Sequence, residues 1–238
     1  MLFLFCAAVL GGALNAVAGG GSFIGLPALI YAGIPAVSAN ATNAFALWPA
    51  SLSSAVGYRR ELASSRSWLL PLGGVSLLGG LMGAVLLIRT SDSSFLRLLP
   101  WLMLLAAATF TFGRRFHTSA RPPMAEIVVL QFVISIYGGY FGGGMGVMML
   151  AVMTIAGMKH IHVMNGLKSV LAVAINGVAV VEFIASGAIA WQPGLVMMAG
   201  AIVGGYLGAA YSRKLDQEWM RRLIIVIAWV MTLYFFVR

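Results

Sequence analysis

GGGSFIGLPAL (Gly19–Leu29) has a counterpart, GGGMGVMMLAV (Gly142–Val152), that begins 123 residues later, at position 142 instead of position 19. In both places a triple glycine interrupts an apolar run, and glycine is a poor residue for the interior of a helix. Glycine-interrupted hydrophobic segments in corresponding positions of two halves are the best sequence indication of a transporter's binding site. The pattern therefore predicts two copies of one unit, each containing a broken membrane segment.

The composition around these motifs is that of an all-α polytopic membrane protein. Of the 238 residues, 61% are hydrophobic and 9% are charged, and the mean hydropathy is +0.97. So few charges cannot cover the surface of a soluble fold. The net charge of +9 lies in short connections between apolar runs, which argues against a nucleic-acid binder with one basic face. The single cysteine, Cys6, excludes an intramolecular disulfide and a cysteine-rich metal site.

The lengths of the apolar runs predict hairpins and full spans, because a span needs about 20 apolar residues. We expect each repeat to be a helical hairpin with glycine at its tip, followed by three transmembrane helices. The first repeat is predicted over 1–113, with its hairpin at 1–32 and spans at 36–57, 68–88 and 95–112. A cytoplasmic linker follows over 114–124. The second repeat is predicted over 125–238, with its hairpin at 125–157 and spans at 162–185, 191–211 and 218–237.

Basic residues cluster in four connections, which the positive-inside rule places in the cytoplasm. They are Arg59, Arg60 and Arg66; Arg114, Arg115 and Arg121; Lys159; and Arg213, Lys214, Arg221 and Arg222. A hairpin plus three spans crosses the membrane an odd number of times, so the second half is predicted to be inverted relative to the first. Hairpin arms that cross the whole bilayer would leave this parity unchanged. If the two arms of each hairpin were instead one broken helix that crosses the membrane once, the protein would have eight spans and parallel repeats. This arrangement fits the distribution of basic residues less well.

The glycine tips are the first candidate binding elements. Irregular backbone at membrane depth is tolerated only where it is buried in protein or lines a wet cavity. A helix that restarts there presents free N–H groups and the positive end of its dipole, which together bind anions. The candidate residues are Gly20, Gly21 and Ser22 in the first half, with Gly143, Gly144 and Met145 in the second. The alternative is a tight turn packed against neighbouring helices.

Polar residues in the span after each hairpin form the second candidate group. They are Asn40, Thr42 and Asn43 in one half, and Asn165, Lys168 and Ser169 in the other. Polar groups within a membrane are costly and usually face an interior path. Lys168 is the most informative, because it lies about six residues into its helix; the alternative is that it reaches back to the cytoplasmic interface. For the asparagines the alternative is hydrogen bonding between helices.

Glu182 is the one acidic residue well inside a span, and it is a candidate for coupling to a proton. The usual enzyme patterns are missing from the sequence, which has no GxSxG, no Walker A lysine in context and no acidic pair. His160 and His162 lie in a basic connection and do not form a metal-ligand cluster. We therefore predict neither an enzyme nor a metal site nor a cofactor.

The residues of the first repeat resemble a known family. GGGSFIGLPALIYAGIPAVSANATNAFAL is similar to the signature of the TauE/SafE sulfite exporter family, also called the 4-toluene sulfonate uptake permease family. The likeness includes the glycine cluster, a Leu-Pro-x-Leu stretch, a Gly-x-Pro connection and an A-x-A-T-N segment. The second copy departs from it, with Leu150 in place of Pro27 and Lys168 near the position of Asn43. The resemblance implies the movement of small anions, especially sulfite, sulfonates and related organosulfur compounds, and sometimes carboxylates.

These observations predict a secondary transporter of a small organosulfur anion, working by alternating access. Its partners would be that anion, membrane lipids and a coupling ion, H⁺ or Na⁺, and its location a cell membrane, the bacterial inner membrane. A carboxylate carrier is the alternative within transport, and a membrane scaffold that transports nothing is the alternative outside it. The sequence leaves open the anion, import against export, the coupling ion, a homo-oligomeric state and whether the hairpin arms cross fully.

Overall fold

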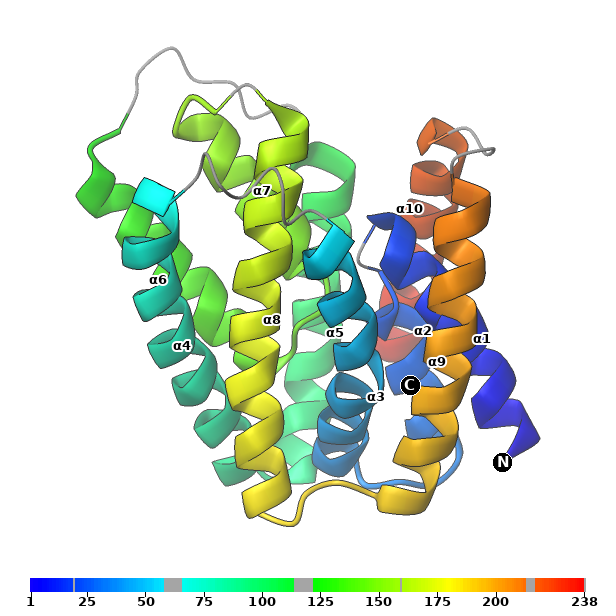
Figure 1. Ribbon diagram of the computed structural model, residues 1–238. Helices are drawn as coiled ribbons and strands as arrows, with labels where there is room; N and C mark the ends of the chain where they lie inside the picture. The colour runs from blue at the N-terminus through cyan, green and yellow to red at the C-terminus, as the bar shows by residue number, and fades with distance from the viewer. Residues whose placement is uncertain (19, 58–65, 114–121, 159, 213–216, 238) are drawn as a thin grey trace.

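The computed structural model describes residues 1–18, 20–57, 66–113, 122–158, 160–212 and 217–237. Within these ranges the chain forms ten helices and no strand, which confirms the predicted all-α fold (Figure 1). The first five are α1 (Leu2–Ala18), α2 (Ser22–Tyr31), α3 (Ala36–Gly57), α4 (Arg66–Arg89) and α5 (Asp92–Phe112). The second five are α6 (Met124–Tyr140), α7 (Met145–Ile155), α8 (Ile161–Ala185), α9 (Trp191–Ser212) and α10 (Gln217–Val237).

Among the described residues, three helices are long and apolar enough to cross a bilayer by length and composition alone. They cover Ser67–Arg89, Asp92–Phe112 and Ile161–Ala185. The helix α3 has 22 residues and is less apolar, because Ser38, Asn40, Thr42 and Asn43 lie in its first half. These polar side chains are buried or half-buried within the protein, which reduces the exposure of polar groups to lipid.

The helices α1 and α2 form an antiparallel hairpin. The ring of Phe3, at the start of α1, lies 5.8 Å from the ring of Tyr31, at the end of α2. The break that joins the two arms includes Gly19, which lies outside the described residues. At Gly11 and Gly21 the two backbones approach closely, because a Cβ added at Gly11 would lie 3.1 Å from the carbonyl oxygen of Gly21.

The helices α6 and α7 form the second hairpin, and its turn requires glycine. Gly142 has φ +80° and Gly144 has φ +79°, in the left-handed region that side chains other than glycine rarely adopt. Gly144 is the N-cap of α7, and its lack of a side chain leaves the first N–H groups of α7 without a side-chain cap. The start of α2, after Gly21, also has no side-chain cap.

The two hairpins adjoin the rest of the bundle at opposite ends. The end of α2 lies near the start of α3 at the lower end of Figure 1, whereas the end of α7 lies near the start of α8 at the upper end. At the lower end the backbone N–H of Val37 donates to Asp92 Oδ1 (2.8 Å), and the Ser38 hydroxyl donates to the carbonyl of Ala188 (2.6 Å). These arrangements agree with the predicted inversion, although the division into repeats stays a prediction.

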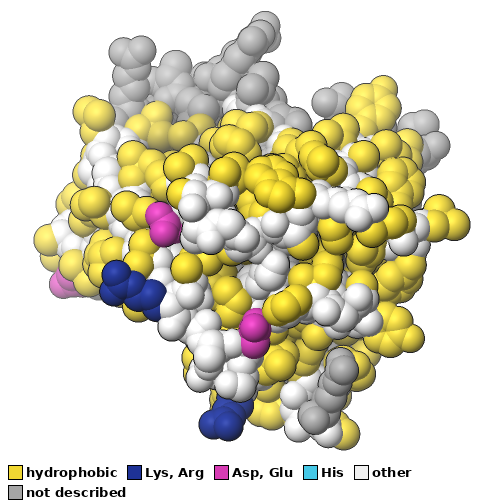
Figure 2. Space-filling model, turned by 90° about the horizontal axis from the view of Figure 1, so that it is seen from below, with side chains coloured by type: hydrophobic (Ala, Val, Ile, Leu, Met, Phe, Trp, Pro, Cys, Tyr) yellow, Lys and Arg dark blue, Asp and Glu magenta, His cyan; other side chains and the backbone are white. Residues whose placement is uncertain are grey.

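Charged side chains are sparse on the lower end of the protein. Figure 2 shows this end with a few Lys or Arg and Asp or Glu side chains scattered among apolar and neutral ones. Most of the basic residues used for the topology prediction lie in 58–65, 114–121, 159 and 213–216, which are outside the described residues. The cytoplasmic side of the protein therefore stays a prediction from the sequence.

Helix pairs that contact each other most extensively do not follow the predicted halves. The helix α1 packs along α9, and α6 packs along α4, so the first arm of each hairpin packs on a helix from the other half. Glycines allow both approaches. A Cβ at Gly12 would lie 2.8 Å from the Cα of Ala201, and a Cβ at Gly83 would lie 2.7 Å from the backbone nitrogen of Tyr140.

Candidate functional site

A cavity of about 100 Å³ lies where the two hairpin breaks meet. Its lining comes from α1, α2 and α3 on one side, and from α6, α7, α8 and the α6–α7 turn on the other. The polar side chains that line it are Asn15, Ser22, Asn40, Asn43, Ser51, Lys168, Ser169 and Asn176. Lys168 is the only charged side chain among the described residues of this lining.

The first wall of the cavity is organised by Asn43, which ties α3 to the start of α2. The amide Nδ2 of Asn43 donates to the hydroxyl oxygen of Ser22 (3.1 Å), so the proton of that hydroxyl is left to donate elsewhere. Ser22 is the first residue of α2, and its backbone N–H is one of the groups that a helix leaves without an internal partner. This bond fixes a hydroxyl and a free N–H at the edge of the cavity.

Asn40 links the two sides of the cavity one helical turn earlier on α3. Its Nδ2 donates to the backbone carbonyl of Tyr140, the last residue of α6 (2.8 Å). Asn40 and Asn43 are buried, and in the described part of the chain neither Oδ1 atom has a hydrogen-bond partner. An unpaired buried acceptor costs about 1–3 kcal/mol. A ligand or water that donates a hydrogen bond to one of these oxygens would remove that cost.

The second wall is organised by Lys168 of α8, which reaches across the start of α7. A Cβ added at Gly146 would lie 3.3 Å from Cδ of Lys168 and 4.0 Å from its Cε, so the lysine stem passes directly over this glycine. Gly146 follows the uncapped first residue of α7. The lysine stem therefore lies beside the N-terminus of α7, where the backbone N–H groups of Met145 and Val147 donate to the carbonyls of Gly142 and Gly144.

Tyr137 holds the glycine turn in place, and no sequence pattern identified it. Its hydroxyl lies 2.6 Å from the carbonyl oxygen of Gly143 and 3.2 Å from that of Leu102 in α5. One proton is thus offered to two acceptors on different elements. The sequence shows only a tyrosine on a hairpin arm, shortly before the glycine turn, and this does not by itself distinguish such a role from packing.

The structure brings six of the predicted site residues to the cavity. They are Ser22, Asn40, Asn43, Met145, Lys168 and Ser169. It adds Asn15 of α1 and Asn176 of α8, and Asn176 lies on nearly the same helical face as Asn165. No sequence pattern marked Asn15 as a site residue, whereas Asn176 is a polar residue deep in an apolar span and could have been found on that ground.

The other predicted residues lie near the cavity without lining it, and several have structural partners. They are Gly20, Gly21, Thr42, Gly143, Gly144 and Asn165. The Thr42 hydroxyl accepts the backbone N–H of Ala190 (2.9 Å), which fixes the connection between α8 and α9. The carbonyl of Gly143 accepts the Tyr137 hydroxyl, and Gly144 supplies the left-handed turn. Their direct contact with a ligand stays a prediction.

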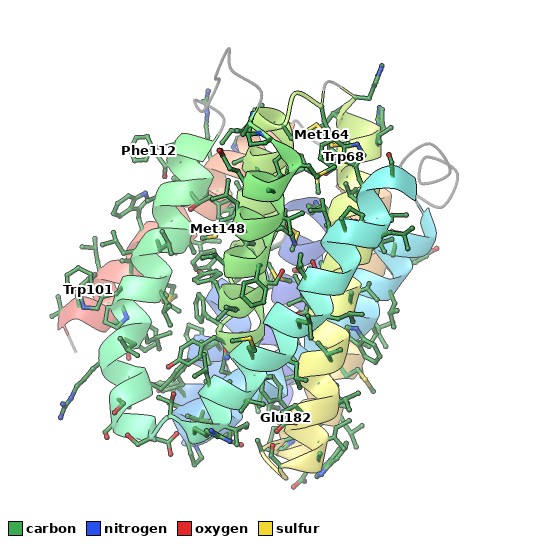
Figure 3. The ribbon with its side chains drawn as sticks, turned by 90° about the vertical axis from the view of Figure 1, so that its left-hand side faces the viewer. Trp68, Trp101, Phe112, Met148, Met164 and Glu182 are labelled. Carbon is green, nitrogen blue, oxygen red and sulfur yellow. The ribbon has the colours of Figure 1, made fainter. Side chains whose placement is uncertain are left out.

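Glu182 lies away from the cavity. Figure 3 shows it at the lower end of α8, whereas Met164 of α8 and Trp68 of α4 lie at the upper end of the protein. Among the described residues, no group of three or more His, Cys, Asp or Glu side chains could hold a metal ion. Glu182 does not line the cavity that holds Lys168, and a coupling role for it stays a prediction.

Replacing Gly25 by alanine is expected to weaken ligand binding at the first wall. A Cβ at Gly25 would overlap Oδ1 of Asn43, so Asn43 must move and its bond to Ser22 is lost. The loss of one hydrogen bond, about 1 kcal/mol, predicts about fivefold weaker binding of a ligand in this cavity. Gly73→Ala is the matched control, because nothing lies within 4 Å of its added Cβ. Equal ligand affinities for the two variants would contradict this role of Asn43.

A polytopic helical protein in which two broken segments meet at a polar cavity has the architecture of a membrane transporter. The chain belongs to the family described as "Sulfite exporter TauE/SafE", whose sequence profile matches residues 4–235. This confirms the resemblance seen in the glycine motifs. The protein is thus a multi-pass membrane transporter of this family.

Curated relatives cover nearly the whole chain. A "Probable membrane transporter protein" of Haemophilus influenzae is 28% identical, over 98% of this chain and 92% of the relative. "Probable membrane transporter protein ORF9" of a Sinorhizobium species is 29% identical, over 96% and 89%. "Probable membrane transporter protein YfcA" of Escherichia coli K12 is 26% identical, over 96% and 87%. No solved structure matches the chain.

Proposed function

We propose that this protein is a secondary transporter of a small organosulfur anion, such as sulfite or a short sulfonate. The observation that carries the proposal is the position of Lys168, the one cation in the described lining of a cavity formed where two uncapped helix N-termini meet. A lysine ammonium is a compact charge with three donors, and helix N-termini add N–H groups that point at an anion. The family description, which names sulfite export, supports the same substrate class.

The anion would be held by charge on one side and by neutral donors on the other. Lys168 and the start of α7 form the charged side, and Ser22 with the start of α2 forms the neutral side. Each helix N-terminus carries the equivalent of about half a positive charge, which adds to that of the lysine. Asn40 and Asn43 each use one N–H on a protein acceptor and keep a second N–H for the ligand.

The volume of the cavity favours a small ligand. At about 100 Å³ it is well below the roughly 300–1,000 Å³ of sites for drug-sized molecules. An ion of a few heavy atoms fits this space, whereas an aromatic sulfonate would require the walls to separate. We therefore propose that the cavity in this conformation binds anions of about the size of sulfite.

The energy source would be an ion gradient or the gradient of the anion itself, because the sequence has no ATP-binding motif. A proton or Na⁺ would be the coupling ion, with Glu182 as the candidate proton carrier at the lower end of α8.

The location would be the bacterial inner membrane, where anionic lipids attract the basic connections. The direction of transport follows from the gradients imposed on the protein.

Uptake of radiolabelled sulfite into proteoliposomes tests the proposal. We expect sulfite flux that unlabelled sulfite and methanesulfonate reduce strongly, and that 4-toluene sulfonate at the same concentration reduces at least about tenfold less, because the cavity is small. Protein-free vesicles and a Lys168→Met protein are the controls. The absence of sulfite flux above protein-free vesicles would reject the proposal.

The two alternatives predict different results in the same assay. A carboxylate carrier is favoured if acetate or a similar carboxylate competes better than methanesulfonate, since Lys168 and helix N-termini also bind carboxylates. A membrane scaffold predicts no flux of any anion, and no anion-dependent increase in thermal stability.

A further inference from the structure

We infer that the units which move during transport are two bodies that each combine parts of both sequence halves. Body 1 is α1, α2, α3 and α9, and body 2 is α6, α7, α8 and α4. Each body thus holds the hairpin and first span of one half together with the second span of the other half. This inference rests on the proposed transport function, and it replaces the simpler expectation that one half moves against the other.

In each body the first arm of the hairpin packs closely, backbone to backbone, on the helix from the other half. In body 1, a Cβ at Gly204 of α9 would lie 2.8 Å from the Cα of Val9, and one at Gly208 would lie 2.7 Å from the Cα of Ala13. In body 2, a Cβ at Gly79 of α4 would lie 2.8 Å from the carbonyl oxygen of Phe132 on α6. Small residues at such spacings let membrane helices approach closely and pack over their length.

Body 2 also contains a buried polar cluster that joins α4 to α6. The amide Nε2 of Gln131 donates to the hydroxyl oxygen of Ser76 (2.9 Å), and the hydroxyls of Ser135 and Ser76 lie 3.3 Å apart. All three side chains are buried. Separating α4 from α6 would break the two bonds to Ser76 and leave only those that Gln131 and Ser135 make within α6, and a hydrogen bond lost inside the membrane is costly.

The cavity lies between the two bodies, with α1, α2 and α3 on one side and α6, α7, α8 and their turn on the other. Figure 1 shows α4, α6, α7 and α8 to the left, and α1, α2 and α9 to the right. Across this boundary α3 meets α8 through side chains, since a Cβ at Gly177 would lie 3.4 Å from the ring of Trp48, an ordinary contact distance. The Trp48 indole N–H donates to the carbonyl of Val173 (3.3 Å), and Asn40 donates to the carbonyl of Tyr140.

A change between outward and inward access must open the cavity on one side and close it on the other. Movement of the predicted halves would separate α1 from α9 and α4 from α6, and would therefore break both sets of close glycine contacts and the Gln131 cluster. Movement of the two bodies keeps them intact and changes the cavity walls and the contacts of α3 with α6 and α8, including the bonds from Asn40 and Trp48 to backbone carbonyls. The helices α5 and α10, which pack on each other, would accommodate the movement at the edge.

Distances between spin labels at three exposed positions distinguish the two movements. Leu10 of α1, Leu70 of α4 and Val129 of α6 are 59%, 83% and 61% exposed, so labels there disturb no packing core. Leu10 and Leu70 share a sequence half but belong to different bodies, whereas Leu70 and Val129 share a body but belong to different halves. The labelled pairs are made as cysteine variants in a Cys6→Ser protein and measured in nanodiscs, with and without sulfite.

We expect the Leu70–Val129 distance to stay a single narrow distribution, and the Leu10–Leu70 distance to shift or split between conditions. The opposite result, or no change in either pair with sulfite, would overturn the inference. The proposed function is judged separately by the flux of the Cys6→Ser protein. A Ser76→Cys/Ser135→Cys disulfide adds a second measurement: sulfite flux should stay within about twofold of the reduced protein, and a larger loss on forming this cross-link also contradicts the inference.

Discussion

Replacing Lys168 by methionine is expected to reduce sulfite flux by at least about 30-fold. Methionine keeps the long flexible stem that lies over Gly146, but it removes the only charged group from the described cavity lining. A hydrogen bond to a charged group contributes roughly 1.5–3 kcal/mol, and the upper part of this range corresponds to the expected loss. Flux per reconstituted protein in proteoliposomes measures it.

Two further measurements make the Lys168 result specific. His162→Met places the same residue type at an exposed position near the start of α8 that does not line the cavity, and it should keep flux within about twofold of the parent. Thermal stabilisation by sulfite should disappear in Lys168→Met while the unliganded protein unfolds at a similar temperature. Full sulfite flux in Lys168→Met would remove Lys168 from the site.

Replacing Gly83 by alanine is expected to destabilise the protein strongly. The added Cβ would overlap the carbonyl oxygen of Ile136 and lie 2.7 Å from the backbone nitrogen of Tyr140, and neither backbone can yield without separating α4 from α6. Overpacking of this kind typically costs about 1–3 kcal/mol of stability. We expect a value near the upper end of this range, because the added Cβ meets backbone atoms and not flexible side chains. Thermal unfolding of the purified protein in detergent measures the effect.

Gly74→Ala provides the control in the same helix. Nothing lies within 4 Å of a Cβ at Gly74, and alanine is the better helix former by about 1 kcal/mol, so this variant should be at least as stable as the parent. Equal melting temperatures for Gly83→Ala and Gly74→Ala would contradict the close packing of α4 on α6 at Gly83.

The features that follow from local sequence could be predicted. Apolar runs determine where helices form, and the glycine triplets determine where two of them break, because glycine readily adopts the left-handed turn found at Gly142 and Gly144. Helical spacing also placed Asn40 and Asn43 on one face, and both line the cavity. The same spacing separates Thr42 by about 200° from Asn40, and Thr42 bonds to Ala190 instead.

Roles that depend on distant partners could not be predicted. Nothing near Tyr137 in the sequence indicates that its hydroxyl holds Gly143 and Leu102, and nothing near Asn15 indicates that it reaches the cavity. Gly25 is an ordinary helix residue until Asn43 is packed against it. Each of these roles depends on which helix lies opposite, and that is set by long-range packing.

The sequence by itself determined a helical membrane protein with two glycine breaks, a family, and a lysine in a helix that follows one of the breaks. These are consequences of hydrophobicity, backbone freedom and charge, which act within a few residues of each position. Only the tertiary structure decided that each hairpin packs on a helix from the other half, and that Lys168 meets Ser22 and Asn43 around one cavity. Complementary shapes between helices far apart in the chain decide this, because glycine permits a close approach without specifying the partner.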